Sequence, residues 1–451
     1  MSDLSLIFVA MAGIFLLLFL VIRTKLHAFV ALLLVSLIVG IAAGMPLSGV
    51  IESMEDGMGG TLGFVAIVVG LGAMFGKLLE VSGGAERLAQ TLIAKFGEDK
   101  AQWALGITGF LVAIPVFFDV GFIILVPIVY GLAKKAGKSV LYYGIPLLAG
   151  LAVTHSFIPP TPGPIAVADL VGADLGWVIL FGAIAGLPAM ILAGPIFGRY
   201  IASKIDVGVP DYMESDDDEP KKGYDKELPG FGLITSLILV PLVLILVNTL
   251  SDLLLEEGNT FRSIATFLGH PFVALTIATL LTFTFLGTKR GYTRQDVQDI
   301  ATKALEPAGI IILVTGAGGV FKQVLIDSGV GDVLGNIMIQ SALPPVLLAF
   351  VISTAVRLAQ GSATVAMVTA AGLISPLIDT LGLDGPMLGL MVISIASGAT
   401  VFSHVNDSGF WLVNRYFGLD VKDTLKSWTV METIIGFVGF GVAFIISLFI
   451  A

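Results

Sequence analysis

The chain repeats itself once, at a spacing of 246 positions. The stretch from Val68 to Leu88 returns as Val314 to Leu334, with eight residues unchanged at this shift. The identical pairs are Val68/Val314, Gly70/Gly316, Gly72/Gly318, Phe75/Phe321, Leu79/Leu325, Ser82/Ser328, Gly83/Gly329 and Leu88/Leu334. In a membrane chain, an internal repeat of this size is typical of secondary transporters, whose two copies are often inverted relative to each other.

The composition requires a lipid environment. Of 451 residues, 56% are hydrophobic and 13% are charged, too little polar surface for a soluble globule. Apolar stretches long enough to cross a hydrocarbon core of about 30 Å run over 4–22, 28–44, 176–198, 231–250, 270–287 and 428–450. The first lacks the flanks of a cleaved signal peptide, so we expect it to be retained. Cysteine is absent, which excludes disulfides and thiolate metal ligands.

The glycine-rich segment Gly316 to Gly319 does not indicate a nucleotide site. A phosphate-binding loop needs a Lys-Ser/Thr pair after its glycines, and none follows here. Small residues in a membrane helix allow a neighbouring helix to approach closely. We therefore expect this segment to lie at a tight contact between two helices.

The charged residues separate into two groups of loops. With Arg23 and Lys25 placed inside, the remaining basic clusters fall on the same side: Lys95, Lys100, Lys134, Lys135, Lys138, Lys204 to Lys226, Lys289, Arg290, Arg294, Lys303, Arg415, Lys422 and Lys426. The other loops are acidic, and Arg262 is their only basic residue. Because Lys and Arg collect on the cytoplasmic side, this places both termini outside and gives five crossings to each half. Five is odd, so the second copy must run opposite to the first.

A polar segment separates the two halves. It contains the charged run from Asp216 to Lys222 and has no apolar face to bury. We expect a first membrane repeat at 1–203, a cytoplasmic linker at 204–229 and a second membrane repeat at 230–451. The expected fold is an all-α polytopic membrane protein with two inverted repeats of five crossings each.

Each half also contains a segment that fits a re-entrant helical hairpin. Residues 101–133 are too many for one span and too few for two spans of about 20 residues. A hairpin with its tip near Phe117 to Gly121 fits this length. The shift of 246 places the corresponding tip at Arg357 to Thr364, within 344–383. Two short spans remain the alternative, because they return the chain to the same face.

After each hairpin comes a span that cannot be one continuous helix. The stretch Val153 to Pro164 holds four prolines, and the stretch Phe402 to Phe410 is rich in polar residues. Unwound backbone is tolerated in a bilayer only where it is buried in protein or lines a cavity. We expect both breaks and both hairpin tips to meet near the midplane, where helix N-termini would suit a carboxylate.

Three residues are candidates for carrying a coupled proton. Asp119 is the only acid in its hairpin segment, and an isolated membrane carboxyl is a functional candidate; the alternative is a helix cap. His155 and His404 occupy the two helix breaks, 249 positions apart, and would bind substrate or transfer protons. The alternative for each is a buried structural histidine.

Polar residues at the tips and breaks form the expected substrate site. Asp407, with Asn406, would ligate a cation, bind substrate hydroxyls or cap a helix. Arg357 would hold a carboxylate or neutralise a buried acid. The full expected binding set is Thr154, His155, Ser156, Thr161, Gly361, Ser362, Thr364, His404, Asn406 and Asp407.

Four motifs resemble those of the gluconate permease family, bacterial gluconate:proton symporters within the ion transporter superfamily. They are FFDVGF at 117–122, THSFIPPTPGP at 154–164, GSATVA at 361–366 and FSHVNDSGFW at 402–411. The resemblance covers essentially the whole chain. It implies paired hairpins, a homodimer around a fixed scaffold, an elevator-like movement and the bacterial inner membrane. Some gluconate permeases have Gly and His where this chain has Ser156 and Thr161, which keeps other sugar acids, hydroxy acids and D-serine open as substrates.

Together these features predict a symporter that imports gluconate or a related small sugar acid with protons. We expect no cofactor, metal or nucleic-acid partner. Sodium-coupled carboxylate symport is the alternative, since hydroxyls and carbonyls at helix breaks also build cation sites. A channel fits less well because no polar pore-lining repeat is present, and a membrane enzyme fits less well because no HExxH-type spacing is present.

Overall fold

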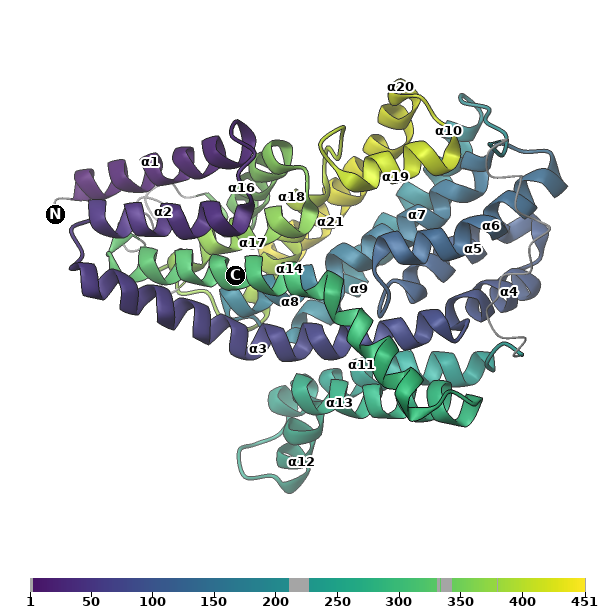
Figure 1. The fold of residues 1–451 in the computed structure, drawn as a ribbon, viewed down its shortest axis with the longest axis horizontal. Coiled ribbons are helices and arrows are strands. Elements are labelled where there is room, and N and C mark those ends of the chain that lie inside the picture. Colours follow the sequence, from purple (N-terminus) through teal and green to yellow (C-terminus); the bar gives the residue numbers. More distant parts are fainter. Residues whose placement is uncertain (1–2, 211–226, 331–332, 334–342, 379, 451) are drawn as a thin grey trace.

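The computed structural model describes residues 3–210, 227–330, 333, 343–378 and 380–450, and these form helices with connecting loops and no strand (Figure 1). Most of the expected linker, 211–226, and the last repeat residue, Leu334, lie outside the described residues. The all-α membrane fold expected from the sequence is confirmed.

The first half consists of ten α-helices. They are α1 (Asp3–Ile22), α2 (Ala28–Ala42), α3 (Leu47–Val81), α4 (Gly84–Phe96), α5 (Ala101–Val112), α6 (Phe118–Ala136), α7 (Val140–Phe157), α8 (Pro162–Val171), α9 (Leu175–Ile191) and α10 (Phe197–Ala202). A π-helical turn at Leu192–Ile196 joins the last two.

The described helices of the second half follow a similar order. They are α11 (Phe231–Leu254), α12 (Thr260–Gly269), α13 (Pro271–Thr282), α14 (Arg294–Asp327), α16 (Pro345–Gln360), α17 (Ala363–Ile374), α18 (Gly385–Thr400), α19 (Ser408–Phe417), α20 (Val421–Thr424) and α21 (Val430–Ile450). Within the described ranges, seven helical segments are long and apolar enough to cross a membrane, so the chain is a multi-pass membrane protein.

The sequence repeat corresponds to a repeat of helices. Shifted by 246 positions, α3 falls on 293–327, and α14 occupies 294–327. Similarly, α8 at 162–171 falls on α19 at 408–417, and each of these two ends at a left-handed glycine, Gly172 or Gly418. The structural repeat therefore extends well beyond the stretch of recognisable sequence identity.

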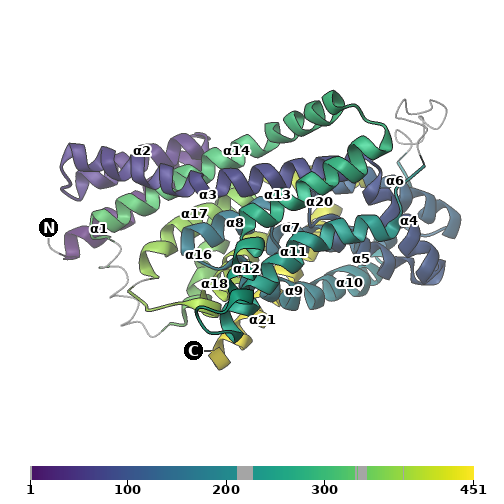
Figure 2. The same cartoon turned by 90° about the horizontal axis from the view of Figure 1, so that it is seen from below.

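The equivalent helices α3 and α14 pack against each other in opposite directions (Figure 2). Near one end Ser53 donates a hydrogen bond to Asp327, and further along Gly57 lies against Gly319. A Cβ at Gly57 would come within 2.5 Å of the Gly319 carbonyl oxygen. Residue numbers increase along α3 in the direction in which they decrease along α14, so the two helices are antiparallel. The glycine-rich segment forms the tight helix contact expected from the sequence.

Each segment expected to form a hairpin is a helix–turn–helix unit. The chain turns between α5 and α6 at 113–117, and between α16 and α17 at Gly361 and Ser362. At 12 residues each, α5 and α17 are about 18 Å long, too short to cross a core of about 30 Å. The hairpins pack on the broken helices that follow them, α5 on α7 and α16 on α18.

Candidate functional site

The two hairpin tips and both broken helices contribute to one cavity of about 500 Å³. The first tip supplies 117–120, the second supplies Arg357 and 362–365, and the C-terminal end of α7 and the start of α19 supply further walls. The remaining wall comes from α14 and from Trp428 and Glu432. Segments far apart in sequence therefore converge on one space, as the repeat pattern predicted.

Three helices begin at the wall of this cavity. The first residues of α6, α17 and α19 all line it. The first turn of a helix carries a partial positive charge, which favours an anion. One N–H of α17 already donates to Ser362 Oγ, and one of α19 already donates to Asp407 Oδ1. The fourth expected helix start, that of α8, lies apart: Thr161 and Pro162 line a separate space of only about 10 Å³.

Among the described residues that line the cavity, Arg357 is the only basic side chain apart from His155. It is 2% exposed, and its Nη2 donates to Asp407 Oδ2 at 2.5 Å. The Nε and Nη1 atoms are buried and have no hydrogen-bond partner. A guanidinium with two unused donors can take a carboxylate while it keeps its own ion pair.

Both carboxylate oxygens of Asp407 accept hydrogen bonds. Its Oδ2 also accepts a short hydrogen bond from Ser403 Oγ, which in turn accepts one from Trp428 Nε1 at 2.7 Å. Its Oδ1 accepts from the backbone N–H of Gly409 at 3.0 Å, so the residue caps α19. Asp407 therefore caps a half-helix, one of the roles left open for it, and pairs with Arg357, which matches the alternative that Arg357 neutralises a buried acid.

Glu432 is a cavity residue that sequence reasoning missed. It lies in the first turn of α21, is 4% exposed, and its Oε1 has no hydrogen-bond partner. The sequence analysis considered 428–450 only as an apolar stretch that crosses the membrane. The available signal was a single acid within that span, which by itself marks a functional candidate.

Asp119 and His155 face the same cavity. Asp119 lies exposed in the first turn of α6, where the preceding N-cap residue, Phe117, makes no side-chain capping bond. The rings of Phe117 and Phe118 are each 6.5 Å from the ring of His155, whose Nδ1 is buried without a partner. The Asp119 carboxylate forms no hydrogen bond or ion pair with the described residues, so it remains available to substrate or protons.

The expected binding set divides into two groups. His155, Ser156, Ser362, Thr364 and Asp407 line the cavity, whereas Thr154, Thr161, Gly361, His404 and Asn406 do not. Thr154 is fully buried behind the wall, and Thr161 donates to Ile158 O at 2.7 Å. The Nδ1 of His404 lies 2.9 Å from Phe402 O, outside the cavity. A residue type at a helix break does not reveal which way its side chain points.

Gly361 and Asn406 join the second hairpin tip to the second break. Gly361 has a φ of 85°, and a Cβ there would lie 2.2 Å from the Asn406 carbonyl oxygen. The Nδ2 of Asn406 donates to Leu358 O at 3.1 Å. These two residues therefore position the cavity wall instead of facing its contents.

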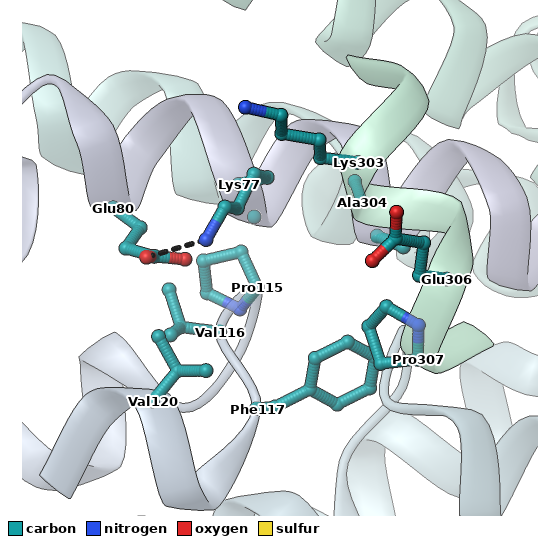
Figure 3. A pocket seen from close by; sticks show the side chains of 12 residues that line it. Lys77, Glu80, Pro115, Val116, Phe117, Val120, Lys303, Ala304, Glu306 and Pro307 are labelled. Carbon is teal, nitrogen blue, oxygen red and sulfur yellow. Dashed lines mark hydrogen bonds and ion pairs between the residues drawn. The ribbon is translucent and has the colours of Figure 1, made fainter. Parts of the chain in front are cut away.

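A second pocket of about 380 Å³ adjoins the cavity (Figure 3). Phe117, Val120 and Pro307 line both spaces, and Figure 3 shows the ring of Phe117 beside that of Pro307. This second pocket also holds Lys77, which pairs with Glu80 at 2.7 Å, and Lys303 and Glu306. A thin layer of side chains at the first hairpin tip thus separates the two spaces.

Two solved structures share this fold. The YdaH transporter of Alcanivorax borkumensis aligns with a TM-score of 0.65 at 15% identity, covering 94% of this chain and 98% of its own. MtrF of Neisseria gonorrhoeae, described as one of a class of antimetabolite efflux pumps, aligns with a TM-score of 0.66 at 12% identity, covering 92% and 93%. At such low identity the likeness concerns the fold alone.

Sequence comparison identifies much nearer relatives. The low-affinity gluconate transporter of Escherichia coli strain K12 is 44% identical over 97% of both chains. The high-affinity gluconate transporter of the same organism is 43% identical over 95% of this chain and 96% of its own. Its Gnt-II system L-idonate transporter is 40% identical over the same shares. The GntP family permease model matches residues 4–449, so the chain belongs to the GntP permease family and is a membrane transporter, not an enzyme.

Proposed function

We propose that the chain imports gluconate or a closely related sugar acid together with protons. The main support is the buried Arg357, whose Nε and Nη1 have no hydrogen-bond partner among the described residues. Three helix N-termini line the same cavity. The names of the relatives, gluconate and L-idonate transporters, support a sugar acid as substrate. A cavity of about 500 Å³ is within the usual size of small-molecule sites.

In this proposal the substrate carboxylate binds Arg357, and the substrate hydroxyls meet the polar side chains of the two tips and breaks. Ser156, Ser362 and Thr364 line the cavity and can both donate and accept hydrogen bonds. A sugar acid such as gluconate carries several hydroxyl groups that a simple fatty acid lacks, so these hydroxyl side chains favour the sugar acid. D-serine remains the competing substrate because it offers a carboxylate and a hydroxyl as well.

Coupling to protons is assigned first to Asp119, because its side chain lines the cavity at the tip of the first hairpin. His155 is the second candidate. His404 lies outside the cavity and could act on substrate only indirectly. Sodium coupling remains the competing mechanism.

For the whole molecule we propose two inverted repeats of five crossings, with both termini outside the bacterial inner membrane. The opposite directions of α3 and α14 and the distribution of basic residues support this arrangement. A homodimer with a fixed scaffold and an elevator-like movement of the hairpins follows from the family resemblance.

The test is uptake into proteoliposomes with labelled gluconate, L-idonate and D-serine, in which pH and sodium gradients are imposed separately. An inward proton gradient should drive gluconate accumulation without sodium. Accumulation driven by sodium alone would replace the proton proposal, and preferential accumulation of D-serine would replace the sugar acid.

A further inference from the structure

Glu432 combines deep burial with the absence of any partner. Its side chain is 4% exposed, and its Oε1 forms no hydrogen bond with the described residues. An isolated carboxylate in such surroundings is very costly, whereas a neutral acid or a paired carboxylate is tolerated. At this position, Glu432 is therefore expected to alternate between a protonated, neutral carboxyl and a carboxylate paired with a cation.

The available counter-ion is Arg357. Glu432 from α21 and Arg357 from α16 line the same cavity, and each presents buried atoms without a partner. Arg357 forms its ion pair with Asp407 and none with Glu432. The unused donors of the guanidinium and the unused acceptor of Glu432 thus border the space where we place the substrate carboxylate.

The other ionisable groups around Glu432 can be enumerated. Arg357 and Asp407 act on it electrostatically, and Asp119 and His155 face the same cavity. The helices α9 and α18, which also pack on α21, carry no titratable side chain. Lys426, just before α21, is exposed and pairs with Asp423 at 3.2 Å. Arg357 is therefore the only buried cation available to Glu432 within the described residues.

We propose that Glu432 is a second proton-binding group, and that its carboxylate and the substrate carboxylate are alternative partners of Arg357. This rests on the proposed proton symport of a monoanion. On the entry side, Glu432 takes one proton from water, and Arg357 binds the substrate through Nε and Nη1. On the release side, the substrate leaves, Glu432 returns that proton to water, and its carboxylate replaces the substrate at Arg357.

With Asp119 carrying the first proton, two protons then accompany each monoanion. The experiment measures steady-state accumulation of labelled gluconate in proteoliposomes over a series of pH gradients, with the membrane potential held at zero by potassium and valinomycin. Each coupled proton contributes about tenfold accumulation per pH unit. The wild-type protein should therefore reach about a hundredfold per unit, and Glu432→Gln about tenfold.

Three controls accompany this variant. Exchange of internal for external gluconate at equal pH should persist in Glu432→Gln, because exchange needs no net proton movement. Asp119→Asn should also fall to about tenfold per pH unit. Glu52→Gln, which alters an exposed acid on α3, should keep the wild-type hundredfold.

A second measurement does not depend on transport, so it can also be applied if Glu432→Gln is inactive in uptake. In detergent, a pH indicator counts the protons taken up when gluconate binds: two in the wild type and one in Glu432→Gln. The proposal is overturned by a wild-type count or slope of one, or by a Glu432→Gln count equal to that of the wild type. A wild type whose accumulation ignores the pH gradient would instead refute the proposed proton symport itself.

Discussion

The side chain of Arg357 decides what the cavity can bind. It keeps a buried ion pair with Asp407 and still has two unused donors, an arrangement that only the branched guanidinium allows. Lysine has one nitrogen, which cannot serve Asp407 and a substrate carboxylate in the same geometry. Arg357 therefore both holds Asp407 in place and offers donors to a substrate carboxylate.

We expect Arg357→Lys to weaken gluconate binding strongly while the protein still folds. Losing a charge-assisted hydrogen bond costs about 1.5–3 kcal/mol, or roughly 10- to 150-fold in apparent affinity. Isothermal titration of the purified protein with gluconate measures this. Arg23→Lys, at an exposed loop position, should bind normally. Unchanged affinity in Arg357→Lys would remove Arg357 from the substrate site.

At the second hairpin tip, Gly361→Ala should destabilise the protein and reduce transport. The left-handed backbone costs a non-glycine residue about 1–2 kcal/mol, and the new Cβ would lie 2.2 Å from Asn406 O. Gly131→Ala is the matched control, because a Cβ there meets nothing within 4 Å. Thermal unfolding in detergent should show a lower Tm for Gly361→Ala alone; equal values would mean that the tip and the break can separate freely.

At the scale of elements, the first hairpin tip separates two spaces. Phe117 lines both the cavity and the pocket that holds Lys77 and Lys303, whereas Phe118 lines only the cavity and packs 5.3 Å from Trp428. Phe117, Val120 and Pro307 line both spaces, and Phe117 has the largest of these three side chains. This makes the tip the expected barrier on the path between the cavity and the second pocket.

We expect Phe117→Ala to open that path. A cysteine placed at Ser156 inside the cavity should then react several-fold faster with a thiol reagent added on the side of Lys77 and Lys303. Because the chain has no other cysteine, labelling reports this position alone. Phe118→Ala should leave the labelling rate nearly unchanged. Equal rates in both variants would indicate a different route into the cavity.

At the scale of the whole molecule, the proposed topology has a direct test. Single cysteines at Ser48 and Asn259 should react with an impermeant maleimide from outside the cell. Cysteines at Lys135 and Arg290 should react only after permeabilisation, because the basic loops are expected inside. The reverse pattern would contradict both the placement of the termini and the charge-based argument for inversion.

Local signals in the sequence were sufficient for the fold class and for the segments that line the cavity. Apolar length determines which segments enter a membrane, and the repeat of 246 positions matches α3 to α14 and α8 to α19. The prolines before α8 and the segment length at 101–133 located a break and a hairpin, because both features act within a few residues.

Only the tertiary structure decided which side chains face the cavity. Arg357 and Asp407 are 50 residues apart and Glu432 lies on another helix, so their proximity depends on how three elements pack. The rotation of α7 about its axis places Ser156 inside and Thr154 outside, and the course of the break between α18 and α19 leaves His404 and Asn406 outside. The sequence by itself determined a membrane-embedded repeat with polar breaks, since composition and chain geometry require it. The unused donors of Arg357 and the unpaired Glu432 arise only when distant segments are packed together and water is excluded between them.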